Sequence, residues 1–225
     1  MHFTPRLLPL LFLLLTLQLQ AQKINPTQID KLVNSNLEGI MPGLAVGIVK
    51  DGQIVYEQYL GYANLEHEVK IDERTRFNIA SNAKQFTALC ILKLIEQGKI
   101  NLDDDFRKYL PNVHSNIQDK ITISHLITHT SGIRDYCDLL GLQGKTWWKH
   151  FIDNGDAIEL LEAQRDLNFK PGTEYLYSNS NYILLAEIVK EVTRQDFSDF
   201  AKTLFEDLEM PNTNFHTLYG EVTPN

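Results

Sequence analysis

Two residues at the start of an apolar segment have the types and spacing of a nucleophile and its base. Ser81 and Lys84 are three positions apart, which on a helix places both side chains on one face. Serine attacks a carbonyl only when a neighbouring group takes its proton, and lysine can do this when burial and positive potential keep it partly neutral. The N-terminal end of a helix would also stabilise the negative charge that develops. The pattern is common, and taken alone it favours a helix-capping serine beside a solvated lysine.

A second pair of polar residues lies almost a hundred positions later. Tyr177 and Asn179 are two positions apart in an expected extended loop, so both side chains can project into one cleft. A phenol can relay protons beside a cationic lysine, and an amide can hold a substrate carbonyl. The alternative interpretation is that Ser178, Asn179 or Ser180 caps the next helix and that Tyr177 belongs to the core.

Two other polar groups indicate structural roles. His125 and His129 have the i, i+4 spacing of metal ligands, but Leu126 stands where a zinc-protease helix carries glutamate. The run from Asp103 to Asp105 lacks the spaced ligands and the glycine of a calcium loop, so it indicates a turn or a helix cap. No metal site and no cofactor are therefore expected.

The first part of the chain predicts a helix followed by a β-hairpin. Asn25-Pro26 is typical of an N-cap followed by proline at the first helical position. The apolar face of this helix would consist of Ile29, Leu32, Val33 and Leu37, before an end at Gly39. Asp51-Gly52 separates two apolar runs, 44–49 and 53–56, which predicts a tight hairpin. Residues 61–73 predict a polar connection with short extended pieces.

The remaining chain predicts helices. Residues 81–97 are apolar on most sides and are closed by Gly98, so we expect this helix at the centre of a domain. Further helices are expected at 123–129, 158–163, 182–192 and 197–208. Residues 135–156 are expected to be irregular, and their Trp147 and Trp148 either line a substrate entrance or pack on the core. Because a two-stranded hairpin is marginal alone, the sheet would need further partners.

Composition and the N-terminus narrow the class of protein. The 225 residues carry a net charge of −8 and no basic cluster, which argues against a nucleic-acid partner. Arg6 precedes the leucine-rich run 7–17, and Ala21 occupies a cleavage position, so residues 1–21 are expected to be a signal peptide. The mature protein would then be exported, with no stable membrane span after cleavage. Its oligomeric state is left open.

These motifs together resemble a known superfamily. The segment 77–88 is similar to the S-x-x-K segment of serine β-lactamases and penicillin-binding proteins, and Tyr177-Ser178-Asn179 resembles the Y-x-N motif of the class C β-lactamase and esterase branch. Residues 126–132 (Leu-Ile-Thr-His-Thr-Ser-Gly) and the Pro-Gly pairs at 42–43 and 171–172 also agree with that branch. The resemblance covers about residues 25–215 and implies a β-lactamase/transpeptidase-like α/β (α+β) fold. This is an antiparallel sheet flanked by helices, with an all-helical subdomain.

The resemblance also implies roles for the polar residues. Ser81 would be the acyl-accepting nucleophile and would supply one oxyanion-hole N–H, and Lys84 would take its proton or tune the site. Tyr177 would be the general base, and Asn179 would position the substrate's amide or carbonyl.

The expected domain, 22–225, divides into a helix-and-hairpin part, 22–80, and a mainly helical part, 81–217. The family's third motif, K-T-G or H-x-G, is not found after Asn179. The C-terminal strands are therefore expected to be missing from this chain.

Two functions remain in competition. The first is an exported serine hydrolase that cleaves an amide, lactam or ester in a small-molecule or peptide-like substrate through an acyl-enzyme. The second is a catalytically impaired fragment or pseudoenzyme that at most binds peptidoglycan-like or β-lactam ligands. The substrate itself does not follow from the sequence.

Overall fold

The computed structural model describes residues 24–35, 39–146 and 149–216. The expected signal peptide and the tryptophans at 147–148 lie outside these ranges. The chain divides into two compact units with the boundary after Phe77, and we refer to residues 24–77 as the hairpin unit and to residues 78–216 as the helical unit. Within the described ranges no helix is long and apolar enough to cross a membrane.

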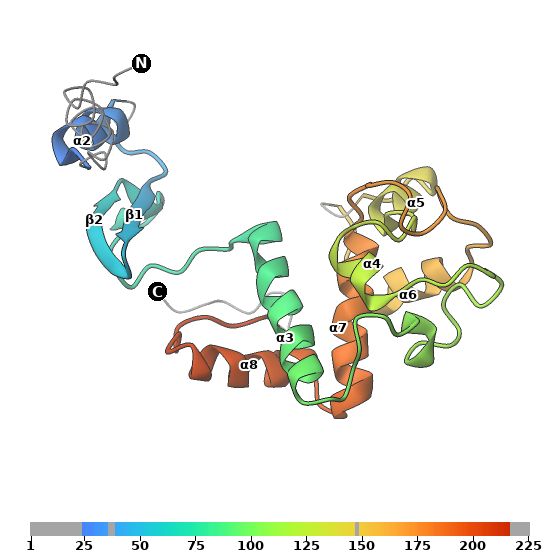
Figure 1. Cartoon of the computed structure of the whole chain (residues 1–225). Helices are drawn as coiled ribbons and strands as arrows, with labels where there is room; N and C mark the ends of the chain where they lie inside the picture. The colour runs from blue at the N-terminus through green and yellow to red at the C-terminus, as the bar shows by residue number, and fades with distance from the viewer. Residues whose placement is uncertain (1–23, 36–38, 147–148, 217–225) are drawn as a thin grey trace, which may run out of the picture. The chain divides into compact units, whose positions relative to one another are not determined.

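The hairpin unit begins with helix α2 (Pro26–Asn34), which the Asn25 side chain caps by accepting a hydrogen bond from the N–H of Gln28. Strands β1 (Leu44–Lys50) and β2 (Gln53–Leu60) pair antiparallel, as Figure 1 shows. Asp51 and Gly52 form the turn, with φ values of 52° and 75°. Positive φ at both turn residues matches the twist of the strands, which explains the predicted hairpin.

A second, shorter ladder follows in the same unit. Strand β3 (Tyr62–Asn64) pairs antiparallel with β4 (Val69–Lys70), where the sequence predicts only short extended pieces. Gly43 donates its N–H to the carbonyl of Tyr62 at 3.0 Å. A Cβ on Gly43 would lie 1.9 Å from the carbonyl oxygen of Leu60, so a residue with a side chain would not fit at position 43 of the Pro42-Gly43 pair.

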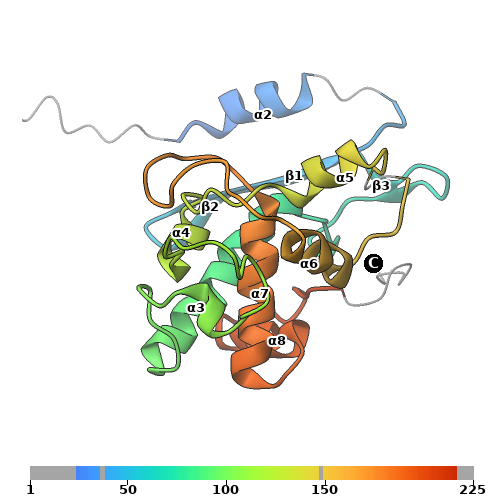
Figure 2. The same cartoon turned by 90° about the vertical axis from the view of Figure 1, so that its right-hand side faces the viewer.

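The helical unit is built around one long helix. Its elements are η1 (Ala80–Ala83), α3 (Lys84–Glu96), η2 (Phe106–Lys108), α4 (Ile123–Ile127), α5 (Tyr136–Leu142), α6 (Asn154–Glu162), α7 (Asn179–Thr193) and α8 (Phe197–Asp207). Helix α7 contacts α3, α4, α5, α6 and α8, and Figure 2 shows it in orange among them. The predicted α/β (α+β) fold class is confirmed, and the described strands form two separate two-stranded antiparallel sheets.

The structure corrects the expected centre of the fold. Helix α3 buries one face (Thr87, Cys90, Ile91 and Leu94), whereas Leu89 and Leu92 are 38% and 47% exposed. Ser81 lies in the 3-10 turn η1 before this helix rather than inside it. The described residues therefore cover one face of α3, which joins the core, although its sequence predicts a helix that is apolar on most sides at the centre of a domain. Periodicity shows which side chains are apolar, but tertiary packing decides which of them are covered.

The segment 135–156, which we expect to be irregular, contains a helix and the start of another. Asp135 caps α5 by accepting the N–H of Cys137 at 2.7 Å. The Asp153 side chain caps α6 by accepting the N–H of Asp156 at 3.0 Å, and the Asp156 side chain accepts the N–H of Asp153. Short capped helices carry too few turns for their apolar period to stand out.

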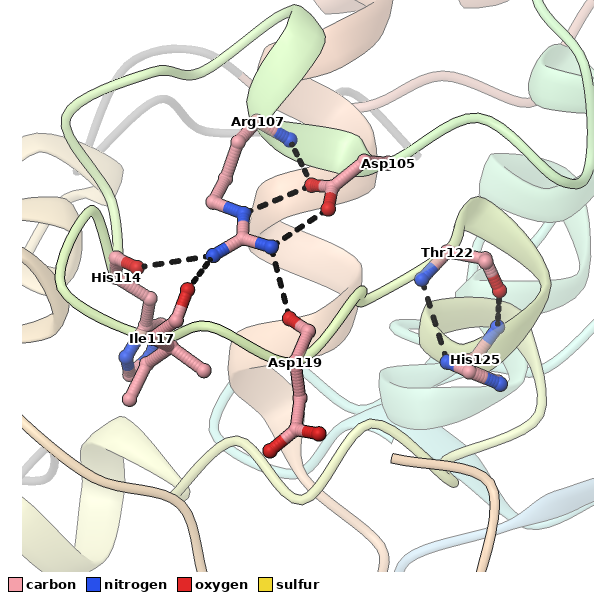
Figure 3. Close-up of polar contacts among 7 residues, drawn as sticks. All are labelled: Asp105, Arg107, His114, Ile117, Asp119, Thr122 and His125. Carbon is pink, nitrogen blue, oxygen red and sulfur yellow. Dashed lines mark hydrogen bonds and ion pairs between the residues drawn. The ribbon is translucent and has the colours of Figure 1, made fainter. Parts of the chain in front are cut away.

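Arg107 fixes the loop that leads into α4 (Figure 3). Its guanidinium makes a two-point contact with Asp105, at 2.9 and 2.6 Å, and donates to the carbonyls of His114, Ile117 and Asp119. A charge-assisted fork of this kind holds several backbone groups in one geometry.

The start of α4 follows directly from this loop. The N–H of Thr122 donates to the Nδ1 atom of His125 at 3.3 Å, and the N–H of His125 donates to the Thr122 hydroxyl at 3.1 Å. This reciprocal pair is a capping box. His125 therefore has a structural role at the helix start.

Candidate active site

The first half of the candidate site is the turn that carries Ser81. Ala80 immediately before it has φ = 45°, a left-handed conformation that costs an L-residue about 1–2 kcal/mol. Lys84 is the first residue of α3, and its Nζ atom donates to the Ser81 Oγ atom at 3.1 Å. Ser81 is exposed and Lys84 is half-buried. The predicted three-residue spacing thus does bring the two side chains together.

The second half is the segment that enters α7. The Tyr177 hydroxyl lies 3.0 Å from the Ser81 Oγ atom, and the Asn179 Oδ1 atom accepts from the Lys84 Nζ atom at 2.9 Å. Tyr177 also donates to the Asn179 Oδ1 atom at 3.2 Å. Tyr177 is 41% exposed, so it is not a core residue. All four predicted side chains therefore form one connected hydrogen-bonding group.

The ammonium of Lys84 is the positive charge at the centre of this group. Its nitrogen lies 5.1 Å from the ring centre of Tyr177 and 5.7 Å from that of Tyr182. A cation so close to two hydroxyl oxygens stabilises negative charge that develops on either one. The burial of Tyr182 raises the pKa of its own phenol, and nearby Tyr177 adds to the shift. Tyr182 therefore stays neutral as a wall of the site.

His129 packs against the segment that carries Tyr177. It is 8% exposed, and its ring lies 4.5 Å from that of Tyr177 and 5.2 Å from that of Tyr182, centre to centre. The His129 Nδ1 atom accepts the N–H of Ser178 at 3.2 Å, which places the proton on the other ring nitrogen. Burial lowers the pKa of His129, and the charge of Lys84 lowers it further. A neutral ring is thus the form that fits this position.

The loop after His129 runs along the segment that precedes Tyr177. The N–H of Gly172 donates to the carbonyl of Thr130, and the N–H of Leu176 donates to that of His129, at 2.8 and 3.0 Å. Gly132 has φ = 76°, and a Cβ there would lie 2.2 Å from the carbonyl oxygen of Phe169. Glycine at this position therefore lets the two backbones approach.

Asp135 is a residue of the site that the sequence reasoning missed. One carboxylate oxygen accepts both the N–H and the side-chain amide of Asn179, at 2.6 and 2.8 Å. An aspartate before a helix is a recognisable N-cap signal, but nothing in the sequence says that it also reaches a residue 44 positions away.

Among the described residues no group of three His, Cys, Asp or Glu side chains could hold a metal ion. The two histidines with metal-ligand spacing are used otherwise, since His125 caps α4 and His129 accepts from Ser178. The groups that the observed contacts bring together are the hydroxyls of Ser81 and Tyr177, the Lys84 amine and the Asn179 amide.

Comparisons with known proteins agree with the motifs. The model of the β-lactamase family matches residues 29–222. The chain is 35% identical over 193 residues to the protein flp of Staphylococcus aureus (strain N315), which covers 84% of this chain and 38% of that protein. It is 33% identical over 162 residues to a D-aminopeptidase of Gluconobacter oxydans (strain 621H), covering 72% of this chain and 30% of the relative.

A solved structure extends the comparison to the fold. The octameric penicillin-binding protein homologue from Pyrococcus abyssi superposes with a TM-score of 0.68 and 29% identity, over 82% of this chain and 42% of that one. The chain therefore spans well under half the length of these relatives.

Proposed function

Because the chain belongs to the β-lactamase family, we propose that it is a serine hydrolase that cleaves an amide, lactam or ester bond through an acyl-enzyme on Ser81. The observation that carries this proposal is the placing of two polar groups around one serine oxygen. The Lys84 nitrogen lies 3.1 Å and the Tyr177 oxygen 3.0 Å from the Ser81 Oγ atom. These are the distances that direct proton transfer requires.

In the proposed reaction Tyr177 first gives its own proton to solvent, and its phenolate oxygen, held beside the Lys84 ammonium, accepts the proton of Ser81 as Ser81 Oγ attacks the carbonyl carbon. The Lys84 ammonium stabilises the negative charge on both oxygens during this step. Tyr177 then gives the proton to the leaving nitrogen or oxygen, and the acyl group remains on Ser81. In the second half Tyr177 takes a proton from water, the hydroxide attacks the acyl ester, and Ser81 recovers its proton as the acid leaves.

Asn179 completes the proposed machinery from the side of the lysine. Its Oδ1 atom accepts from Lys84, and its Nδ2 atom donates to Asp135. These contacts support a role in holding Lys84, while the expected contact with the substrate's amide or carbonyl stays a prediction.

The proposed substrate class is a peptide-like amide, lactam or ester. The D-aminopeptidase relative supports an amide of a D-residue within this class.

We also propose that the protein is exported to the cell exterior or periplasm. The test is the N-terminus of the secreted protein, which should begin at Gln22. A secreted or periplasmic protein that keeps residues 1–21, or a protein retained inside the cell, would contradict the export part of the proposal.

The catalytic proposal is tested with a fluorophosphonate or penicillin probe and mass spectrometry. We expect an adduct on Ser81 in the wild-type chain and in the Ser115→Ala control, whose altered serine is exposed and distant in sequence. The Ser81→Ala variant should carry no adduct.

The absence of an adduct on folded wild-type chain would refute the catalytic proposal, as would an adduct that survives Ser81→Ala. An adduct at Ser81 without turnover of an ester or of nitrocefin would favour the competing function, in which the chain binds such ligands but does not hydrolyse them.

A further inference from the structure

We propose that Asp135 is a positioning residue that orients the amide of Asn179 toward Lys84. This inference rests on the proposed hydrolase function and adds a residue to it. Hydrogen bonds link Asp135 to Asn179, and Asn179 to Lys84 and Tyr177. Lys84 and Tyr177 in turn contact Ser81.

The donor and acceptor properties of the neighbours decide how the Asn179 amide lies. A carboxylate only accepts hydrogen bonds, and a lysine ammonium only donates them. The NH2 group of Asn179 must therefore face Asp135, at 2.8 Å, and its oxygen must face Lys84, at 2.9 Å. A flip of the amide would turn its oxygen toward the Asp135 carboxylate and its NH2 group toward the Lys84 ammonium, so both neighbours favour the observed orientation. Removing the Asp135 carboxylate would therefore remove one of the two contacts that hold the amide in this orientation.

Asp135 also holds the backbone from which Asn179 projects. Asn179 is the first residue of α7, and the Ser178 side chain at the capping position makes no cap hydrogen bond. The N–H of Asn179 instead donates to the Asp135 carboxylate at 2.6 Å. The cap of this long helix therefore comes from a different segment of the chain, so side chain and backbone of Asn179 are held by the same oxygen.

The position of Asp135 is itself fixed from both sides. The hydroxyl of Ser180 accepts the N–H of Tyr136 at 2.8 Å and donates to the carbonyl of Arg134 at 2.7 Å. The other carboxylate oxygen of Asp135 accepts the N–H of Cys137. A group locked in this way can hold a reacting neighbour within the small tolerance that catalysis requires.

The test is a double-mutant cycle on the rate of acylation by the penicillin probe. We expect Asp135→Ala to lower the second-order rate constant about 10–100-fold, the scale of a misplaced reacting group. Because Asp135 acts through Asn179, adding Asp135→Ala to Asn179→Ala should cost less than about 2-fold more. Losses that multiply in the double variant would overturn the proposal.

The matched control is Asp153→Ala, which removes the N-cap of α6; among the described residues the Asp153 side chain accepts from the N–H of Asp156 and makes no hydrogen bond to the site. It should cost similar stability but leave acylation within about 2-fold of the wild type. An equal loss of acylation in both variants would assign the effect of Asp135 to helix capping alone.

A second measurement does not depend on activity. The side-chain NH2 signal of Asn179 in a ¹⁵N–¹H spectrum should be shifted in the wild type and in Asp153→Ala, and should move toward the random-coil position in Asp135→Ala. An unchanged signal would overturn the positioning role. If no probe ever labels Ser81, the proposed function fails, and this signal still decides whether Asp135 orients Asn179.

Discussion

The hairpin unit and the helical unit differ in the interactions that stabilise each of them. Within the described ranges of the hairpin unit Ile71 is the one buried residue, and helix α2 contains no buried residue. In the helical unit one continuous apolar cluster connects α3, α4, α6, α7 and α8 through side chains such as Leu94, Leu126, Leu161, Leu184 and Leu204. The described hairpin unit is therefore supported by the pairing of its strands and by local turn and cap contacts, whereas a core supports the helical unit.

This difference bears on where the candidate site lies. Ser81, Lys84, Asp135, Tyr177 and Asn179 all belong to the helical unit, which has the core. A site that depends on distances near 3 Å between segments far apart in sequence needs rigid elements behind it. The core around α7 provides them, since α7 begins at Asn179 itself.

The largest expected difference between the units is the effect of removing a leucine. Leu184 is completely buried in α7, and Leu184→Ala should cost about 2–5 kcal/mol of unfolding free energy because it leaves a cavity. Leu32 in α2 is 75% exposed, so Leu32→Ala should change stability by less than about 0.5 kcal/mol. Denaturant unfolding followed by circular dichroism measures both values. Equal losses would mean that the hairpin unit also depends on a core.

The same contrast explains how much of the fold could be predicted. The Asp51-Gly52 turn and the Asn25 cap act on their immediate neighbours, so a few letters of sequence suffice for the hairpin and for the start of α2. Helix α2 ends at Asn34 rather than at the expected Gly39, and the expected Leu37 contact lies outside the described residues. The central place of α7 could not be predicted, because it depends on which helices cover which faces. Helix α5 was missed because seven residues offer too little apolar period.

For the site, the serine, lysine, tyrosine and amide residues could be named from motifs, since those motifs are local. Their supports could not. Asp135 reaches Asn179 across 44 positions, and His129 reaches Ser178 across 49. Such pairs form only when the loop from His129 to Asp135 packs against the start of α7, which is a property of the folded unit.

A second expected difference concerns pH. His114 in the helical unit is fully buried, and neither of its ring nitrogens has a hydrogen-bond partner among the described residues. Burial lowers its pKa from 6.5 to about 4, and the charges of Arg107 and Arg134 act in the same direction. Below pH 6.5 the unfolded chain binds a proton that the folded chain does not. Stability should therefore fall as the pH drops from 6.5 to 4, by on the order of 3 kcal/mol.

The variant His114→Gln should flatten this dependence, since glutamine does not titrate, although some slope should persist because the pKa values of His125 and His129 are lowered too. The control is His67→Gln in the hairpin unit, where the histidine is exposed and the slope should not change. Denaturant midpoints between pH 4 and 7 measure the slopes. Parallel slopes for the wild type and His114→Gln would contradict the assignment.

A third difference separates backbone conformation from packing. Gly52 and Gly132 have nearly the same φ, 75° and 76°, but a Cβ on Gly52 meets no atom within 4 Å, whereas one on Gly132 lies 2.2 Å from the carbonyl oxygen of Phe169. Both alanine variants carry the cost of the left-handed conformation. Gly132→Ala should lose about 1–3 kcal/mol more, because the two backbones must move apart. Equal losses in thermal or denaturant unfolding would show that this contact yields without cost.

The smallest expected change in unfolding free energy is at the turn before Ser81. Its sign shows whether backbone strain or helix propensity dominates there. Ala80 has φ = 45°, so Ala80→Gly should raise the unfolding free energy by up to about 1 kcal/mol through relief of strain. Ala83, with φ = −60°, follows it in the same turn, and Ala83→Gly should lower stability by about 0.5–1 kcal/mol. If both variants are destabilised, the turn at Ala80 is not strained. If the signs are opposite and Ala80→Gly also slows acylation of Ser81, the strain at this turn contributes to the placing of the nucleophile.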